Sequence, residues 1–147
     1  MKDSTAKLQQ TLHDDIPLTR EMGITVAAYD GRQLRLAAPL APNLNHKCTA
    51  FGGSLYSLAV LCGWGLLHLK LEEAGLHRHI VIQEADIEYL LPVAQDMEAE
   101  CEVDDAALQR FMAMLQKHGR SRLSLEVAIK RDGHAAVKFS GRYVVHE

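Results

Sequence analysis

Two adjacent glycines, Gly52 and Gly53, stand where a polar loop gives way to a long apolar segment. Backbone N–H groups at a helix start lack partners within the helix and lie at the positive end of its dipole. Because glycine lets a ligand approach the backbone closely, this pair could hold an oxyanion or polarise a carbonyl. The alternative is that the glycines only form a tight turn. Asn45, in the preceding loop, could hold a substrate oxygen, orient a water, or shape the loop through an Asx turn.

Metal and disulfide chemistry are not indicated. His77 and His79 lie close together, but no cysteine or third histidine has a ligand-like spacing to them, so we expect a surface loop and no metal site. Cys48, Cys62 and Cys101 are an odd number without a CxxC pair, which argues against a disulfide framework and a cysteine-based zinc site. This usage indicates a reducing compartment, and we expect a cytoplasmic protein.

Composition narrows the class of protein further. The 147 residues are 48% hydrophobic and 24% charged, which predicts one globular domain over residues 1–147. A net charge of −3 and 5% aromatic residues argue against nucleic-acid binding. The N-terminus is polar and starts no apolar segment, so we expect no signal peptide. Residues 51–67 lack charge, but they are short for a membrane span and contain glycines and serines, so a buried core helix is favoured.

Hydrophobic periodicity predicts an α+β fold. Residues 51–74 have a helical period and are apolar almost all round, so other structure must wrap them, and a curved sheet is the favoured wrapper. Asp30-Gly31 and Asp132-Gly133 are signals for hairpin turns. The other predicted elements are helices at 5–22, broken by Pro17, and at 105–117, a loop at 39–49, and strands at 24–29, 33–38, 80–91, 97–103, 122–130 and 136–145.

Three motifs together resemble the hotdog-fold thioesterases. The segment Asn45-His46-Lys47-Cys48-Thr49-Ala50-Phe51-Gly52-Gly53 is similar to their active-site loop and the start of their central helix. Ile87-Glu88-Tyr89-Leu90-Leu91-Pro92-Val93 resembles their next strand, which ends in aromatic-x-x-Pro, and Arg120-Ser121-Arg122 resembles the basic start of their fifth strand. More closely, Asn43-Leu44-Asn45-His46-Lys47 followed by Thr49-Ala50-Phe51-Gly52-Gly53-Ser54-Leu55-Tyr56 resembles the YiiD C-terminal thioesterase family, here as an expected stand-alone form. The resemblance covers nearly the whole chain and implies a curved antiparallel sheet wrapped around a long central helix.

The resemblance also implies roles for the residues of the loop and helix start. Asn45 and the amides of Gly52 and Gly53 would hold the carbonyl oxygen of an acyl thioester, with Gly53 counted among the catalytic groups. Thr49 either caps the helix or binds the ligand, and capping is favoured. Cys48 stands where these families often have glycine. The other expected substrate contacts at the helix start are Phe51, Ser54 and Ser57.

The sequence departs from the better-known families at two positions. Phe51 replaces their histidine, and Val60 falls where their catalytic carboxylate stands. Because hydrolysis needs a group that brings water to the thioester, another acid must take that role or the role is unfilled. Asp86 is the first candidate and Glu84 the second, on a strand expected to lie beside a partner subunit's helix. The alternative is that these acids are simply the solvated face of a strand.

An acyl thioester implies a carrier, coenzyme A or an acyl carrier protein, and no other cofactor. Both carriers bring phosphates, for which Arg120 and Arg122 are the favoured ligands, although ordinary surface charge explains them equally well. We therefore expect an acyl thioesterase. The absence of a carboxylate at Val60 keeps open a non-hydrolytic module that binds acyl thioesters, and a dehydratase or hydratase on the same fold ranks last.

An assembly is also expected. An open curved sheet in a chain of this length leaves an edge strand unpaired, and natural proteins cover such edges. The resemblance implies edge-to-edge pairing across a two-fold axis, so we expect a homodimer, with a tetramer built from two dimers as a further step. The active site would then be shared, with the Gly52-Gly53 helix start of one chain beside the Asp86 strand of the other.

Overall fold

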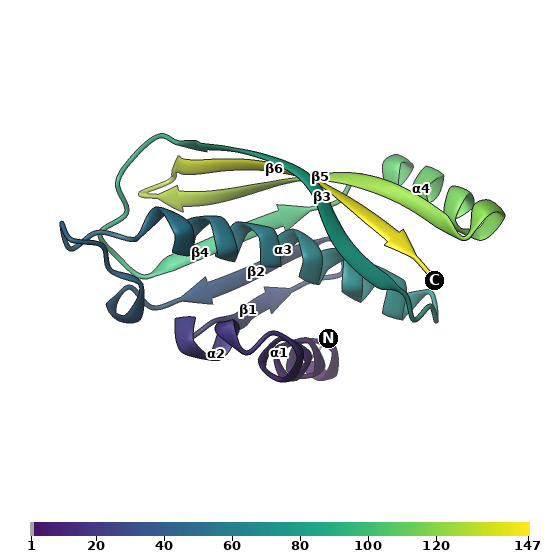
Figure 1. The fold of residues 1–147 in the computed structure, drawn as a ribbon, viewed down its shortest axis with the longest axis horizontal. Helices are drawn as coiled ribbons and strands as arrows, with labels where there is room; N and C mark the ends of the chain where they lie inside the picture. Colours follow the sequence, from purple (N-terminus) through teal and green to yellow (C-terminus); the bar gives the residue numbers. More distant parts are fainter. Residues whose placement is uncertain (1) are drawn as a thin grey trace.

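The longest helix, α3 (Gly52–Glu73), runs along the inner face of a six-stranded antiparallel sheet (Figure 1). The computed structural model of the protein describes residues 2–147. Across the sheet the strand order is β1-β2-β4-β5-β6-β3. The strands are β1 (Thr25–Tyr29), β2 (Gln33–Ala38), β3 (His79–Tyr89), β4 (Met97–Glu102), β5 (Arg120–Arg131) and β6 (His134–His146), and the other helices are α1 (Lys2–Asp15), α2 (Leu18–Met22), the 3-10 turn η1 (Ala41–Asn43) and α4 (Asp105–His118).

The predicted α+β architecture, with a sheet around one central helix, is confirmed. Both predicted hairpins turn at their Asp-Gly pairs, where Gly31 has a φ of 96° and Gly133 a φ of 80°. The predicted first helix is divided before α2, as the proline between its halves requires. Pairing β2 with β4 and β5 with β6 leaves β1 and β3 as the two edges of the sheet.

α3 is the core helix because its apolar face is buried against the sheet. Leu58, Cys62 and Leu66 on this face are fully buried. By length and composition α3 is able to cross a membrane, but 67% of its apolar window is buried within the fold, as expected for the core helix of a globular domain. A second stripe, formed by Tyr56 and Trp64 with Val60 between them, is only partly buried.

A tyrosine from β6 inserts its hydroxyl into the backbone of α3. The hydroxyl of Tyr143 donates to the carbonyl of Val60 at 2.7 Å, and the backbone N–H of Trp64 donates to the same hydroxyl. An ideal Cβ at Gly63 would lie 2.3 Å from this oxygen, so only glycine leaves room for it. The ladder between residues 60 and 64 is thereby bridged by a side chain, a recognised way to bend a helix.

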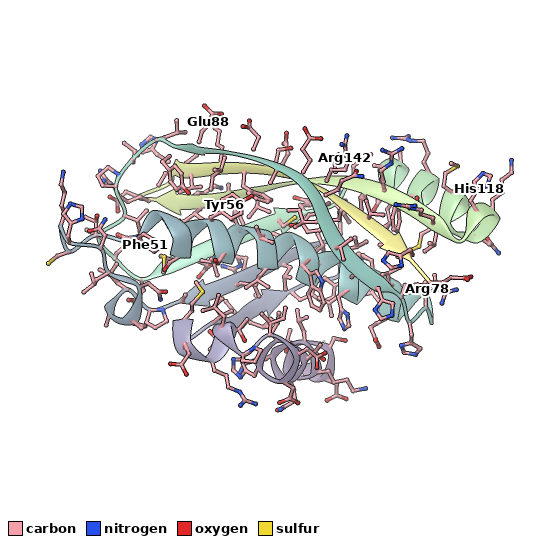
Figure 2. All side chains as sticks on the ribbon, viewed as in Figure 1. Phe51, Tyr56, Arg78, Glu88, His118 and Arg142 are labelled. Carbon is pink, nitrogen blue, oxygen red and sulfur yellow. The ribbon has the colours of Figure 1, made fainter. Side chains whose placement is uncertain are left out.

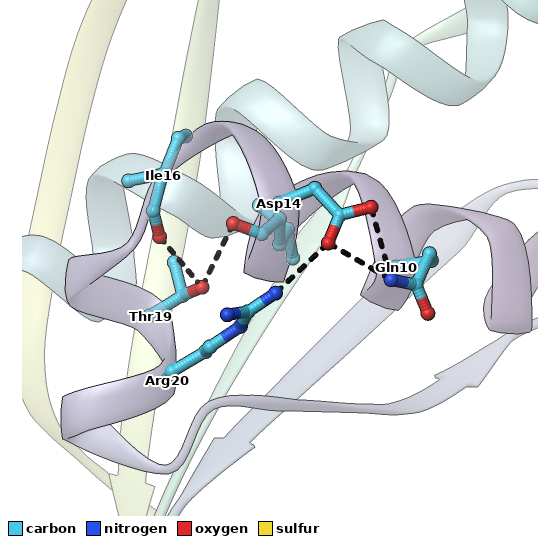
Figure 3. Close-up of polar contacts among 6 residues, drawn as sticks. Gln10, Asp14, Ile16, Thr19 and Arg20 are labelled. Carbon is cyan, nitrogen blue, oxygen red and sulfur yellow. Dashed lines mark hydrogen bonds and ion pairs between the residues drawn. The ribbon is translucent and has the colours of Figure 1, made fainter.

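The junction between α1 and α2 is held by one threonine and one ion pair (Figure 3). The buried hydroxyl of Thr19 lies 2.9 Å from the carbonyl of Leu12 and 2.8 Å from that of Ile16. The same two carbonyls also accept from the backbone N–H groups of Ile16 and Thr19. Arg20 reaches back to Asp14 at 2.9 Å. These contacts keep the two helices together beside β1.

The two edges of the sheet differ. α1 covers the β1 edge, because the side chain of Gln9 accepts from the N–H of Val26 at 3.0 Å and a ring nitrogen of His13 lies 2.8 Å from the carbonyl of Ile24.

β3 forms the other edge, and within residues 2–147 it pairs only with β6. It is 11 residues long and mostly exposed. Val81 is 49% exposed and Ile82 38%, which is unusual for β-branched residues on a long strand. This edge is therefore the part of the sheet that most needs cover.

Candidate active site

The start of α3 presents backbone donors to solvent. Phe51 precedes the helix in an extended conformation, and its carbonyl accepts from the N–H groups of Ser54 and Leu55 at 3.0 and 3.1 Å. Among residues 2–147, no acceptor faces the N–H groups of Gly52 and Gly53. Gly53 is itself exposed. Two adjacent donors therefore remain available at the positive end of a 22-residue helix.

Two half-exposed aromatic rings flank the glycine pair. An ideal Cβ at Gly52 would lie 3.6 Å from the ring of Tyr89, and one at Gly53 would lie 2.4 Å from the ring of Phe51. Tyr89 is 52% exposed and Phe51 55%. Because a side chain at position 53 would displace the Phe51 ring, glycine there has a packing reason as well as a chemical one. Figure 2 shows Phe51 at the start of α3 and Tyr56 further along the same helix.

Asn45 is used to shape the loop before the helix. Its side-chain oxygen accepts from the N–H groups of Lys47 at 2.8 Å and Thr49 at 3.1 Å, an Asx turn. Its amide donates to the Thr49 hydroxyl at 2.8 Å and approaches the carbonyl of Ala50 at 3.4 Å. Every polar group of this side chain is engaged, so Asn45 positions the helix start from behind.

The favoured prediction that Thr49 caps the helix is wrong. The residue at the cap is Phe51, and no side chain caps α3 there. The Thr49 hydroxyl instead accepts from Asn45, which ties the loop to itself. Cys48 has a φ of 62°, the left-handed region that glycine adopts easily and that other residues adopt rarely.

Ser54 and Ser57 lie on the first turns of the helix. The hydroxyl of Ser57 donates to the carbonyl of Gly53 at 2.9 Å and keeps its lone pairs free for a water. Tyr56, one residue earlier, packs edge-to-face on Phe139 with ring centroids 5.7 Å apart. Its partly buried stripe continues through Val60 to Trp64 and gives the helix start an apolar wall.

Asp86 and Glu84 lie on the opposite face of the sheet from α3. Ala85 and Ile87, their neighbours along β3, pack against the core, so alternation points the acids outward. Asp86 lines an open hollow of about 560 Å³ on the outer face. Figure 2 shows Glu88, the next acid of this series, pointing away from the helix side. The structure therefore does not bring either predicted acid to the helix start.

Arg120 and Arg122 lie at the far end of the sheet. Tyr89 pairs with Val137, which pairs with Ile129, and Arg120 is nine residues further back along β5. At about 3.3 Å per residue this separation is roughly 30 Å. The two arginines line a hollow of about 560 Å³ together with Gln83, Met114, His118 and Ser121. Within one chain they are not part of the site at the helix start.

Sequence reasoning missed the role of Tyr89. Its hydroxyl donates to the carbonyl of Gly52 at 3.0 Å, although the two residues are 37 positions apart. Burial, and secondarily the charge of Tyr56, raises the pKa of Tyr89 above its usual value, so the phenol stays protonated at neutral pH. The aromatic-x-x-Pro motif at the end of β3 was the signal that could have found it.

No group of three or more metal-ligating side chains occurs in residues 2–147. Backbone donors, hydroxyls and aromatic rings gather at the helix start. Such a site can polarise a carbonyl and accommodate an apolar arm.

A long helix wrapped by a six-stranded antiparallel sheet, with open amides at its first turn, is the hotdog fold of the thioesterases. Residues 5–147 match the family described as "Putative thioesterase (yiiD_Cterm)", and the chain belongs to this family.

Solved structures agree with this assignment. A Chlorobaculum tepidum protein of unknown function is 37% identical with a TM-score of 0.93, over 97% of this chain and 94% of that one. A Shewanella oneidensis protein described as a "putative thioesterase" is 33% identical with a TM-score of 0.92, over the full length of both chains. A thioesterase from Haemophilus influenzae is 16% identical with a TM-score of 0.75, over 96% of this chain and 89% of that one, and shows the shared fold alone.

Proposed function

We propose that the protein hydrolyses acyl thioesters of coenzyme A or of an acyl carrier protein. The observation that carries the proposal is the pair of open N–H groups at Gly52 and Gly53, held by an Asn45 loop in a chain of a thioesterase family. These groups would donate to the thioester oxygen as it gains negative charge. Water adds to the carbonyl carbon, the C–S bond breaks, and the products are a carboxylic acid and a free thiol.

The attacking water has one proposed partner in this arrangement. The Ser57 hydroxyl lies one turn into the helix on the Gly53 side, and its free lone pairs can accept from a water. Asp86 and Glu84 do not enter the proposal. If two copies join their β3 edges into one continuous sheet, the outer faces of both copies lie on the same side of that sheet. Asp86 and Glu84 of the second copy would therefore also point away from the helices.

We propose a homodimer formed along the bare β3 edge. Antiparallel pairing of β3 with a second copy about Glu84, its middle residue, would set the His79 end of one chain against the Tyr89 end of the other. The hollow with Arg120 and Arg122 would then approach the partner's helix start. This geometry gives the two arginines a role with the carrier phosphates that a single chain does not allow. A tetramer of two such dimers is a further step.

One alternative has a specific observation in its favour. Neither Val60 nor the acids of β3 supply a carboxylate to the helix start, because Val60 lies on the apolar stripe and the acids face outward. A site that polarises the carbonyl without activating water would bind an acyl thioester and leave it intact. The alternative function is therefore a non-hydrolytic acyl-thioester binding module.

One experiment separates these functions. Purified protein is incubated with acyl-CoA and acyl-carrier substrates of several chain lengths, and the free acid is measured by chromatography. We expect hydrolysis that Gly53→Ala lowers at least tenfold, because the new methyl group displaces the Phe51 ring and crowds the donors. The matched control is Gly65→Ala on the same helix, where the new Cβ would meet only the side-chain ends of Leu34 and Leu8. Saturable binding with an intact thioester would establish the binding module instead.

Sedimentation velocity tests the assembly. We expect a dimer with no monomer at micromolar concentration. A stable monomer in that range would refute the shared site and remove the proposed role of Arg120 and Arg122 at the partner's helix start.

A further inference from the structure

The strand β3 contacts the first peptide unit of α3 through one tyrosine. The hydroxyl of Tyr89 donates to the carbonyl oxygen of Gly52 at 3.0 Å, and the ring lies against the same residue. That carbonyl and the N–H of Gly53 belong to one planar peptide unit. A bond that fixes the carbonyl therefore also fixes the direction of the Gly53 N–H.

We propose that Tyr89 is a positioning residue that orients and polarises the Gly53 N–H toward the substrate carbonyl. This inference rests on the proposed function, because it assigns Tyr89 to the donor of the same site. Tyr89 does not touch the reacting carbon in this arrangement and acts through the peptide it holds.

Two physical effects support this role. A donor bound to the carbonyl of an amide withdraws electron density and makes the N–H of that amide a stronger donor, which is the cooperativity of hydrogen-bond chains. Gly52 is the first residue of α3, so its carbonyl also accepts within the helix, and the Tyr89 hydroxyl is the side-chain donor that the described residues add to it. The Phe51 ring lies against the other glycine of the pair, 2.4 Å from an ideal Cβ at Gly53.

The competing explanation is that the bond only ties β3 to α3. Tyr89 is 52% exposed, so a merely structural bond there would add little to stability. The two explanations differ in what they predict for Tyr89→Phe, which keeps the ring on Gly52 and removes only the hydroxyl. A structural tie predicts an unchanged donor and unchanged turnover, whereas positioning predicts a weakened donor in a fully folded protein.

The test has two readouts on Tyr89→Phe, after sedimentation confirms an unchanged assembly. The first is the ¹⁵N and ¹H amide resonance of Gly53, which we expect to shift because its peptide carbonyl has lost a donor. The second is steady-state kinetics, in which we expect kcat to fall roughly three- to tenfold, the worth of one hydrogen bond, with KM little changed. The matched control is Tyr29→Phe, which removes a tyrosine hydroxyl bonded to Glu73, the last residue of α3. This variant should leave both readouts unchanged.

The outcomes are distinguishable. A Gly53 resonance that does not move in Tyr89→Phe overturns the inference whether or not the protein hydrolyses thioesters. Wild-type kcat in Tyr89→Phe, in a protein that does hydrolyse them, also overturns it. If the wild type hydrolyses nothing, the proposed function fails, and a shifted Gly53 resonance still supports the positioning of the donor.

Discussion

Replacing Gly63 by alanine should destabilise the protein, although alanine is the better helix former. An ideal Cβ at this position lies 2.3 Å from the hydroxyl oxygen and 2.8 Å from the ring of Tyr143, which is completely buried and cannot move aside cheaply. Overpacking of this kind costs about 1–3 kcal/mol, and displacing the hydroxyl from the Val60 carbonyl costs about 1 kcal/mol more. The gain in helix propensity returns about 1 kcal/mol. We expect a net loss of about 2 kcal/mol in the free energy of unfolding.

Urea denaturation at one fixed protein concentration measures this change, since a dimer makes the midpoint depend on concentration. The matched control is Gly65→Ala on the same helix. Its Cβ would meet only the methyl ends of Leu34 and Leu8, at 3.0 and 3.3 Å, and the gain in helix propensity offsets this small crowding, so we expect a change near zero. If Gly63→Ala is as stable as the wild type or more so, helix propensity outweighs the contact, and the insertion of Tyr143 into the ladder is refuted.

Three further predictions follow from the structure. Burial raises the pKa of Cys101 to about 12 and that of Cys62 well above its usual value, so a thiol reagent at pH 8 should label only Cys48 in folded protein and all three cysteines in urea. Burial is the main cause that raises the pKa values of Tyr29 and Tyr143, and the neighbouring Glu73 raises that of Tyr29 further. The folded chain therefore keeps protons that the unfolded chain loses near pH 10, so urea midpoints should fall as the pH rises past 10. Asp86→Asn should leave kcat within about twofold of the wild type, since its side chain lies on the outer face, and a loss of tenfold or more would return it to the site.

Much of the fold could be predicted because local pattern and tertiary context agree. The Asp-Gly pairs turn both hairpins, and alternation along β5 buries the residues it marks as apolar. The uncharged run at 51–67 forms the core helix, and its glycines and serines had favoured a core helix over a membrane span. In each case the signal lies within a few neighbouring residues, which is where sequence patterns are informative.

The site was harder because its contacts join distant parts of the chain. The Asx turn at Asn45 was foreseen as one alternative, but the engagement of Thr49 by Asn45 was not, and the helix begins at Gly52, too late for Thr49 to cap it. The position of Asp86 was available from alternation, because Ala85 and Ile87 beside it are apolar and must face the helix. Tyr89 reaches Gly52 across 37 positions, a contact that no local pattern encodes.

The outward carboxylates of β3 bear on how newly made chains avoid aggregation. A bare strand with exposed Val81 and Ile82 is a template for stacking, and in-register parallel stacking would set Glu84 on Glu84, Asp86 on Asp86 and Glu88 on Glu88 in every layer. In a single antiparallel pair centred on Glu84, the two Glu84 residues are the only identical acids that face each other. Each of them already pairs with Arg142 of its own chain at 2.5 Å. Charge repulsion thus penalises fibrils far more than the two-chain assembly. These acids, which the proposed site does not use, act as gatekeepers of the exposed edge.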